Sequence, residues 1–249
     1  MTFPRLAAIR FVIALAALLG VAGASPASAH PHVWVTVEST VLFENGSIVG
    51  IRYRWSFDEY YTMMAIQGLD TNNDGNYDRK ELSELAQVNM DGLKEFNYFT
   101  QVKLADQAQA TGDPRDYFLE YAEATAEGES EPAPQPGTPA SAKGKADAKP
   151  KVLSLHFTLP LKQPVLAEAP GFTFTVSDPT FFIAFELAKK DPVTLGEGAP
   201  AGCRISIGGS ERQAEDAKRL GEAFFNQMGS QGVGLSIAKP VAVSCEPRQ

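Results

Sequence analysis

The sequence predicts a mainly β protein of the α+β type: an antiparallel β-sandwich with a helical, EF-hand-like insertion and one C-terminal helix. Three observations support this prediction. Apolar residues alternate in short runs before and after the middle of the chain, as in half-buried strands. Helical periodicity surrounds a loop of calcium-binding spacing at 58–98. A second helical pattern, at 211–229, precedes the final strand-like run.

Residues 1–29 have the composition of a secretory signal peptide. Arg5 and Arg10 precede an apolar run, and small residues lead to Ala29. The run is too short to span a bilayer comfortably, and no later stretch reaches the length that a transmembrane helix needs. We therefore expect an exported chain that starts at His30, forms a single domain over 30–249 and does not insert into the membrane.

The net charge of the chain limits its partners. It is −8, and loss of Arg5 and Arg10 with the leader makes the exported protein more acidic. An acidic exported protein is a poor candidate for binding nucleic acid or anionic lipid, and a good one for binding cations.

The strand-like runs begin at Val33 and continue to Phe57 around the turn Glu44-Asn45-Gly46, a hairpin signal. The helical unit follows, and we interpret it as an insertion between strands of one sheet. Residues 127–151 contain no large apolar residue and are rich in Pro, Ala, Gly and Lys, so they predict a disordered loop between two strands of the same domain. Further extended runs are expected at 100–105, 117–122, 152–161, 171–187, 203–209 and 240–247.

Cys203 and Cys245 are the two cysteines of the chain. An even number in an exported protein favours a disulfide, which we expect to tie the last strand to an earlier one. Two free buried thiols are the alternative, and CxxC-type redox or zinc spacing is absent.

The run DTNNDGNYDRKE has the spacing of an EF-hand calcium loop. Calcium prefers six to eight oxygen ligands, and this spacing supplies early side-chain oxygens, a glycine at the sharp turn and a late glutamate. The alternative is a polar turn between two helices. Because no second EF-hand exists to support the loop, we expect Tyr77 to pack against the body of the protein. The predicted calcium ligands are Asp70, Asn72, Asp74, Asn76 through its carbonyl, Asp78 and Glu81, with Gly75 at the turn.

The histidines suggest a second metal site. His30 and His32 are separated by one residue, so a strand would direct both imidazoles to one side, and the amine of His30 is a further nitrogen ligand. Pro31 lacks an amide proton, which excludes a chelate built on successive backbone nitrogens. Imidazole ligands suit zinc, nickel, cobalt or copper, and affinity order alone does not choose among them. A solvated N-terminal arm is the alternative.

Two further residues are candidates for that transition-metal site. His156 alternates with apolar neighbours and is therefore not an obvious core histidine; the alternative is a surface histidine with a local hydrogen bond. Asp178, in the turn before Pro179, is the candidate carboxylate, and its alternative is a turn residue that binds its own backbone. We interpret Asp58 as the cap of the first helix. No catalytic signature stands out, so the sequence favours a protein that is not an enzyme.

Several of these runs together resemble domain-of-unknown-function family 1007: HPHVWV, RWSFDEYYTMM, DTNNDGNYDRKEL, NYFTQV, LHFTLPL and SDPTFFIAFEL, with the late cysteines. The resemblance covers the chain after the leader except for the Pro/Ala/Lys-rich segment. It implies a periplasmic component of an uncharacterised ABC-type transport system, associated with nickel/cobalt-type permeases. It also points to His30 and His32 as metal ligands and to Asp178 as a marked position.

The leading hypothesis is a periplasmic metal-binding accessory or substrate-binding component of a transition-metal transport system. In it, His30, His32, His156 and Asp178 hold the transition metal and calcium orders the helical insertion, with a membrane permease as the partner. One alternative is a copper enzyme with an N-terminal histidine brace. The other is a calcium-stabilised adhesion or scaffold domain.

Overall fold

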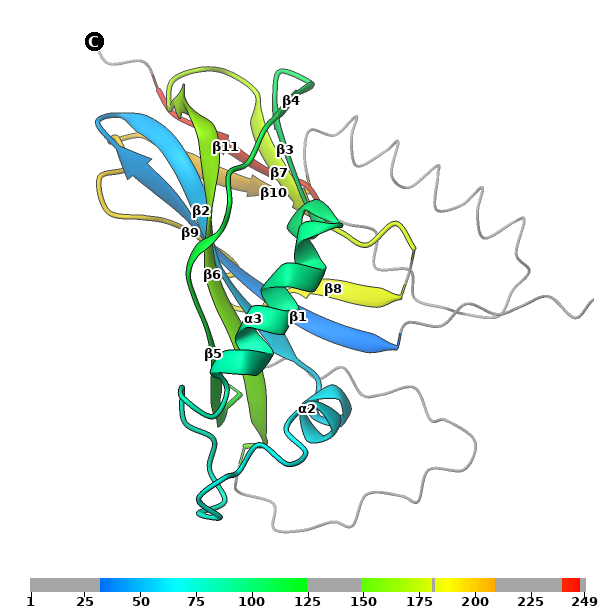
Figure 1. Cartoon of the computed structure of the whole chain (residues 1–249). Helices are drawn as coiled ribbons and strands as arrows, with labels where there is room; N and C mark the ends of the chain where they lie inside the picture. Colours follow the sequence, from blue (N-terminus) through cyan, green and yellow to red (C-terminus); the bar gives the residue numbers. More distant parts are fainter. Residues whose placement is uncertain (1–31, 125–148, 181, 209–238, 247–249) are drawn as a thin grey trace, which may run out of the picture. The chain divides into compact units, whose positions relative to one another are not determined.

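The computed structural model describes residues 32–124, 149–180, 182–208 and 239–246 (Figure 1). The predicted leader, His30 and the predicted helix at 211–229 lie outside the described residues. The helical elements are α2 (Glu59–Ala65), α3 (Ser83–Lys94) and the 3-10 turn η1 (Asn97–Phe99). The strands are β1 (Val33–Glu44), β2 (Ser47–Phe57), β3 (Thr100–Leu104), β4 (Gln107–Gln109), β5 (Arg115–Glu123), β6 (Lys151–Leu166), β7 (Phe172–Val176), β8 (Ile183–Leu187), β9 (Val193–Leu195), β10 (Arg204–Ile207) and β11 (Val241–Ser244).

The first sheet, sheet A, has the order β5-β6-β2-β1-β8, and β9 also pairs with β1. The predicted hairpin is confirmed: β1 and β2 are antiparallel, with Asn45 and Gly46 at positive φ in the turn. β5 and β6 are also antiparallel, and Glu123 pairs with Lys151. The strands before and after the Pro/Ala/Lys-rich segment are therefore neighbours in one sheet, while the segment predicted to be disordered lies outside the described residues except for its last three residues.

Sheet A is mixed rather than wholly antiparallel. β1 pairs in parallel with β8, where Val35 faces Phe185, and in parallel with β9. A tight hairpin forces neighbouring strands to be antiparallel, but β8 follows a strand of the other sheet, so no hairpin sets its direction. The parallel register still places apolar residues of both strands on the same buried face.

The second sheet, sheet B, has the order β10-β11-β7-β3-β4. All pairings among its described strands are antiparallel, including β7 with both β3 and β11. The sequence did not predict β4 or β9, because strands of three residues are too short to show alternation.

The two sheets contribute to one hydrophobic core. Along β1, buried and half-buried residues alternate, as expected for a strand with one face in the core. Tyr53 of sheet A approaches Phe174 of sheet B, with ring centroids 6.5 Å apart. Trp55 meets Phe157 edge to face at 5.0 Å. The mainly β, two-sheet class predicted from the sequence is therefore confirmed.

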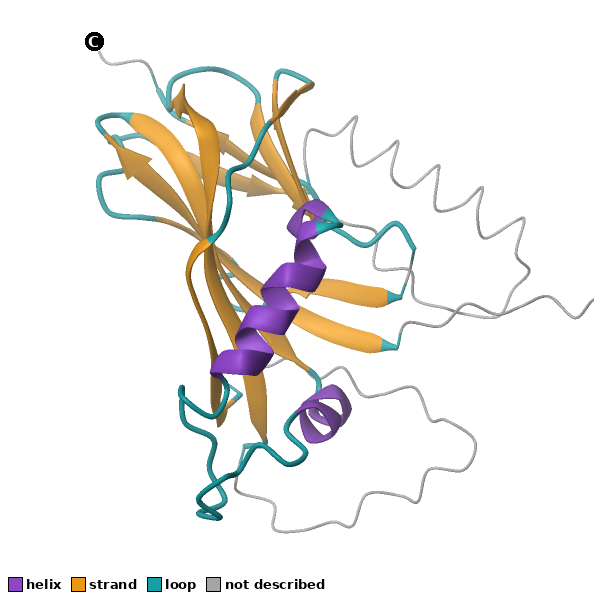
Figure 2. Cartoon of the chain, in the orientation of Figure 1, coloured by secondary structure: helices purple, strands orange, loops and turns teal. Residues whose placement is uncertain are grey.

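The helices connect the two sheets (Figure 2). They leave sheet A after β2 and enter sheet B at β3, so the prediction of an insertion within one sheet was wrong. Hydrophobic burial explains their position, because Leu82, Ala86 and Met90 recur at helical spacing and are buried in the common core. Among the described helices, none is long and apolar enough to cross a membrane.

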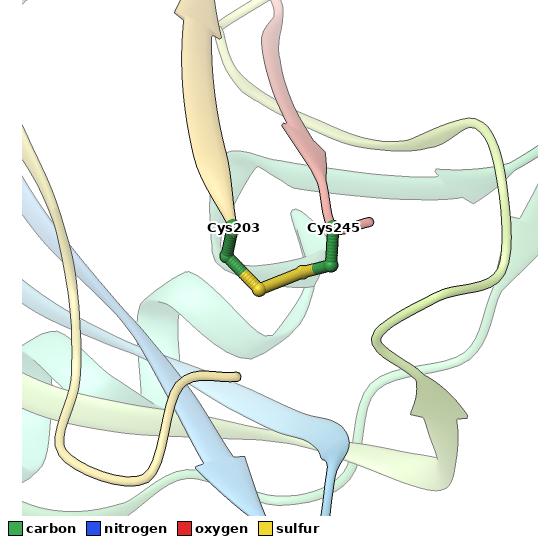
Figure 3. Close-up of a disulfide and its surroundings, with 2 residues drawn as sticks. All are labelled: Cys203 and Cys245. Atoms are coloured by element: carbon green, nitrogen blue, oxygen red, sulfur yellow. A yellow bond between two sulfur atoms is a disulfide. The ribbon is translucent and has the colours of Figure 1, made fainter. Parts of the chain in front are cut away.

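Cys203 and Cys245 form a disulfide, as predicted (Figure 3). Cys203 lies just before β10 and Cys245 just after β11, and these two strands are antiparallel neighbours. The bond therefore ties the last strand to its partner across a sequence separation of 42 residues. Disulfides of this kind persist in oxidising compartments.

Candidate metal-binding loop and histidine sites

The segment from Asp70 to Glu81 turns back on itself through hydrogen bonds to its own side chains. The Asp70 carboxylate accepts from the backbone N–H of Asp74 at 3.1 Å and of Gly75 at 3.0 Å. Gly75 has φ +75°, in the left-handed region that favours glycine, and sits at the predicted sharp turn. The first half of the loop therefore curls around the Asp70 oxygens.

The next side chains continue the pattern. Asn72 Oδ1 accepts from the backbone N–H of Asp74 at 2.8 Å, and Asp74 Oδ1 accepts from that of Asn76 at 2.7 Å. Asp78 Oδ1 accepts from the backbone N–H of Glu81 at 2.9 Å. Side-chain oxygens of the predicted ligands are thus held by the backbone of the same loop.

Glu81 joins the two ends of the loop. Its Oε1 accepts from the backbone N–H and the hydroxyl of Thr71, at 2.9 and 2.8 Å, and its Oε2 accepts from the backbone N–H of Asp78 at 3.1 Å. Hydrogen bonds from the Asp78 backbone and the Thr71 hydroxyl hold the pKa of the Glu81 carboxyl below its ordinary value. The last predicted ligand is therefore ionised and folded back toward the first.

The donor set of the loop fits a hard cation. Carboxylate and amide oxygens carry two lone pairs each, so most of the oxygens named above retain one after their backbone hydrogen bonds. The side chains have not converged, however: within the four described ranges, His, Cys, Asp and Glu do not gather in threes as a metal site.

The helices that flank the loop depart from the expected EF-hand. α2 ends at Ala65, where Ile66 follows as its C-cap, and a further turn separates it from Asp70. α3 begins at Ser83, just after Glu81. Helices therefore lie on both sides of the loop, but the first is short and does not lead directly into it, so an EF-hand is not shown.

The loop is seated on the edge strand β5. Tyr77 meets Tyr121 edge to face with ring centroids 5.0 Å apart, which agrees with the expectation that Tyr77 packs against the protein's own body. The ammonium of Lys151 donates to Asn76 Oδ1 at 3.0 Å. Desolvation raises the pKa of Tyr77, and the nearby carboxylates of Asp70 and Glu81 raise it further.

His156 belongs to a separate polar cluster on the other face of sheet A. Its Nε2 lies 3.1 Å from Glu120 Oε2, and its ring stacks on Phe118. Burial lowers the pKa of His156; Glu120 acts in the opposite direction, and Arg54 lowers it further. Arg54 is the cross-strand neighbour of His156 and forms an ion pair with Glu38 at 3.4 Å.

The sequence did not identify Glu120 or Arg54 as neighbours of His156. Their positions depend on the register of β5 and β2 against β6, which no local pattern specifies. A cation at His156 would lie beside the positive charge of Arg54, which favours the alternative of a locally bonded strand histidine.

His32 immediately precedes β1 and lies far from His156. Its backbone N–H donates to the carbonyl of Phe182 at 2.8 Å, and the two rings have centroids 5.0 Å apart. Glu38 occupies the β1 position in line with Arg54 and His156, and His32 precedes it by six residues. At about 3.3 Å per strand residue, the two histidines are roughly 20 Å apart along the sheet. They do not share a metal site.

Asp178 lies near His32 in the chain's fold, but its carboxylate is fully engaged. Oδ1 accepts from the backbone N–H and hydroxyl of Thr180, and Oδ2 from the backbone N–H of Phe182 and Ile183, all within 2.7–3.1 Å. Four hydrogen bonds fill the lone pairs of a carboxylate. Asp178 therefore orders the turn that leads into β8, and its contacts correspond to the turn-residue alternative.

Asp58 acts as a helix cap, as interpreted from the sequence. Its Oδ1 accepts from the backbone N–H of Tyr61 at 2.8 Å at the start of α2. Its Oδ2 accepts from the backbone N–H of Trp34 at 2.9 Å, which links the helix to β1.

Comparison with known proteins identifies one family and one distant relative. The sequence profile of the family described as "Protein of unknown function (DUF1007)" matches residues 15–245. An uncharacterised protein of Haemophilus influenzae is 23% identical over 220 residues, which cover 88% of this chain and 92% of that protein. No solved structure matches.

Proposed function

We propose that this chain, which belongs to the DUF1007 family of proteins of unknown function, is an exported cation-binding accessory protein that serves a membrane permease. In this proposal the loop 70–81 holds calcium and the N-terminal histidines hold a divalent transition metal. The disulfide between Cys203 and Cys245 supports an oxidising location such as the periplasm. The acidic net charge of −8 supports cations as ligands.

One observation carries the calcium proposal: Glu81 is folded back to Thr71 while the loop backbone already turns around Asp70. The first and last predicted ligands, Asp70 and Glu81, are thus already drawn toward each other within the loop. In this proposal, rotation of the side chains on calcium binding turns the remaining lone pairs toward a common centre. Calcium would supply positive charge that offsets part of the negative charge of the loop carboxylates.

The loop is exposed, and within the described residues no second loop of this kind lies beside it. Sites of this kind fall near the weak extracellular range of about 10⁻⁴ to 10⁻³ M. Such an affinity suits an ion that stays bound outside the cytoplasm, and it fits a constitutive structural role better than signalling.

Isothermal titration calorimetry of the exported chain with calcium tests this proposal. We expect one site of about 10⁻⁴ to 10⁻³ M, and at least a roughly tenfold loss of affinity in Glu81→Gln, which removes the bidentate carboxylate. Glu84→Gln is the matched control, because Glu84 is an exposed acidic residue in the first turn of α3, just outside the loop. Absence of calcium binding, or equal affinity in wild type and Glu81→Gln, would refute the proposal.

The transition-metal part of the proposal rests on His32. Its imidazole is exposed at the start of β1 beside Phe182, so it is open to a ligand from outside. His156 and Asp178 are not required as ligands. His156 is distant from His32, and the Asp178 carboxylate already accepts four hydrogen bonds. His30, which lies outside the described residues, is the proposed second ligand, and the metal would pass between this site and the permease.

A further inference from the structure

The loop 70–81 contacts the edge strand β5 on both faces of sheet A. Tyr121 lies on the inner face of the sheet, as does Leu119, which is buried in the core. Tyr77 packs against the ring of Tyr121 on this face. Phe118 lies on the opposite face, where the guanidinium carbon of Arg79 is 3.6 Å from its ring centroid. β5 is the terminal strand of sheet A on this side. The loop therefore straddles the sheet edge.

A third contact joins the loop to the neighbouring strand β6. Lys151, the first residue of β6, donates to Asn76 Oδ1 at 3.0 Å and lies within 5.7 Å of the Tyr121 ring centroid. At loop position 7 a calcium ligand is the backbone carbonyl, so the Asn76 side chain stays free for this contact.

The two residues that straddle β5 flank a predicted ligand. Asp78 lies between Tyr77 and Arg79 in sequence, and its backbone N–H and side chain both hydrogen-bond with Glu81. A change in the position of Asp78 therefore acts directly on both neighbours. The predicted calcium ligands and the two residues that contact β5, Tyr77 and Arg79, are therefore expected to move together.

We propose that residues 76–79 are a cation-dependent clasp, in which calcium bound by the loop locks Tyr77 and Arg79 onto the two faces of β5 and closes this edge of sheet A. The inference rests on the calcium function proposed above. Edge strands present unpaired backbone groups to other chains, and proteins commonly cover them with loops.

The electrostatics of the loop give the clasp its dependence on the ion. Without a cation, the carboxylates of Asp70, Asp74, Asp78 and Glu81 repel one another within one short loop. Repulsion favours a wider loop and opposes the approach of Arg79 and Tyr77 to the strand. Bound calcium weakens this repulsion, so the closed clasp is favoured.

Hydrogen–deuterium exchange of the exported, disulfide-bonded chain tests the clasp, with calcium and with a chelator. We expect amides in peptides from β5 to exchange roughly tenfold more slowly with calcium, because local opening of the edge becomes rarer. Peptides from β11, in the other sheet, serve as the internal reference and should exchange at the same rate in both conditions.

The double variant Tyr77→Ala/Arg79→Ala removes both contacts but keeps every predicted calcium ligand. It should still bind calcium, several-fold more weakly, and it should lose the calcium-dependent protection of β5. Lys80→Ala is the matched control, because it removes a positive charge from the same loop but leaves the contacts of Tyr77 with Tyr121 and of Arg79 with Phe118 in place. It should keep the protection.

The outcomes separate the two proposals. If calorimetry shows calcium binding but β5 exchanges at the same rate with and without calcium, the clasp is refuted and the calcium function stands. Retained protection in the double variant also refutes the clasp. If the wild-type chain binds no calcium, both proposals fail.

Discussion

The ring of Phe118 lies nearly parallel to the imidazole of His156, with centroids 4.5 Å apart and planes within 8° of each other. The stack is continued on the same face of the sheet by Arg79, over Phe118, and Arg54 is the next cross-strand neighbour of His156. His156 therefore lies against an aromatic ring and near two cations, with one carboxylate, Glu120, as its hydrogen-bond partner. This setting favours the neutral form of the His156 imidazole, which makes one side-chain hydrogen bond, to Glu120.

The pH dependence of stability should report this setting. The folded-state pKa of His156 is lowered, first by burial and then by Arg54 and Arg79, against the opposing effect of Glu120. Below about pH 6.5, the ordinary value for histidine, the unfolded chain then binds the proton more readily than the folded one. The free energy of unfolding should fall as the pH decreases through this range.

Urea denaturation of wild type and His156→Gln at pH 7.5 and 5.5 measures this contribution. Wild type should lose more stability between the two values than His156→Gln does. His32→Gln is the control, because His32 is exposed, and it should behave as wild type. Equal losses in wild type and His156→Gln would contradict the prediction.

Asp178 should contribute mainly to stability. Asp178→Ala removes the acceptor of four part-buried hydrogen bonds, three of them from backbone N–H groups, at a cost of about 2–4 kcal/mol. The stability of Asp178→Asn, which keeps one acceptor oxygen, should lie between that of wild type and that of Asp178→Ala. The midpoint of urea denaturation measures both changes, with Glu186→Gln on exposed β8 surface as the control. A variant that loses bound transition metal without losing stability would show instead that Asp178 is a ligand.

His32 and His156 should behave independently toward a transition metal. Because they are roughly 20 Å apart along the sheet, a metal bound at the N-terminus should be lost in His32→Ala and kept in His156→Ala. Native mass spectrometry of the exported protein gives the metal stoichiometry and the N-terminal residue in the same spectrum. Loss of the metal in both variants would mean that the two histidines act together, against the separation in the fold.

The disulfide should stabilise the end of sheet B. It closes a sequence separation of 42 residues, for which the chain-entropy model gives about 4 kcal/mol, and measured values fall in the range of about 2–5 kcal/mol. Cys203→Ser/Cys245→Ser should lose stability of this order in urea denaturation. Reduction of the wild-type chain should give the same loss, and an unchanged midpoint after complete reduction would contradict the prediction.

The sequence by itself determined the elements whose chemistry is local. Alternation along Val33–Glu44 and the Asn45-Gly46 turn predicted the first hairpin, since strand periodicity and positive φ are properties of a few adjacent residues. The same holds for the cap at Asp58 and for the spacing of oxygen donors from Asp70 to Glu81. The pairing of Cys203 with Cys245 followed from their being the two cysteines available.

Tertiary structure decided which of these residues meet. Only strand order and register place His156 beside Arg54 and Glu120 rather than near His32, and only the direction of β8 makes sheet A mixed. The seating of Tyr77 and Arg79 on opposite faces of β5 depends on contacts 39–44 residues apart in sequence. Such contacts arise from the burial of whole faces in a common core, and that burial is a property of the assembled sheets rather than of any single segment.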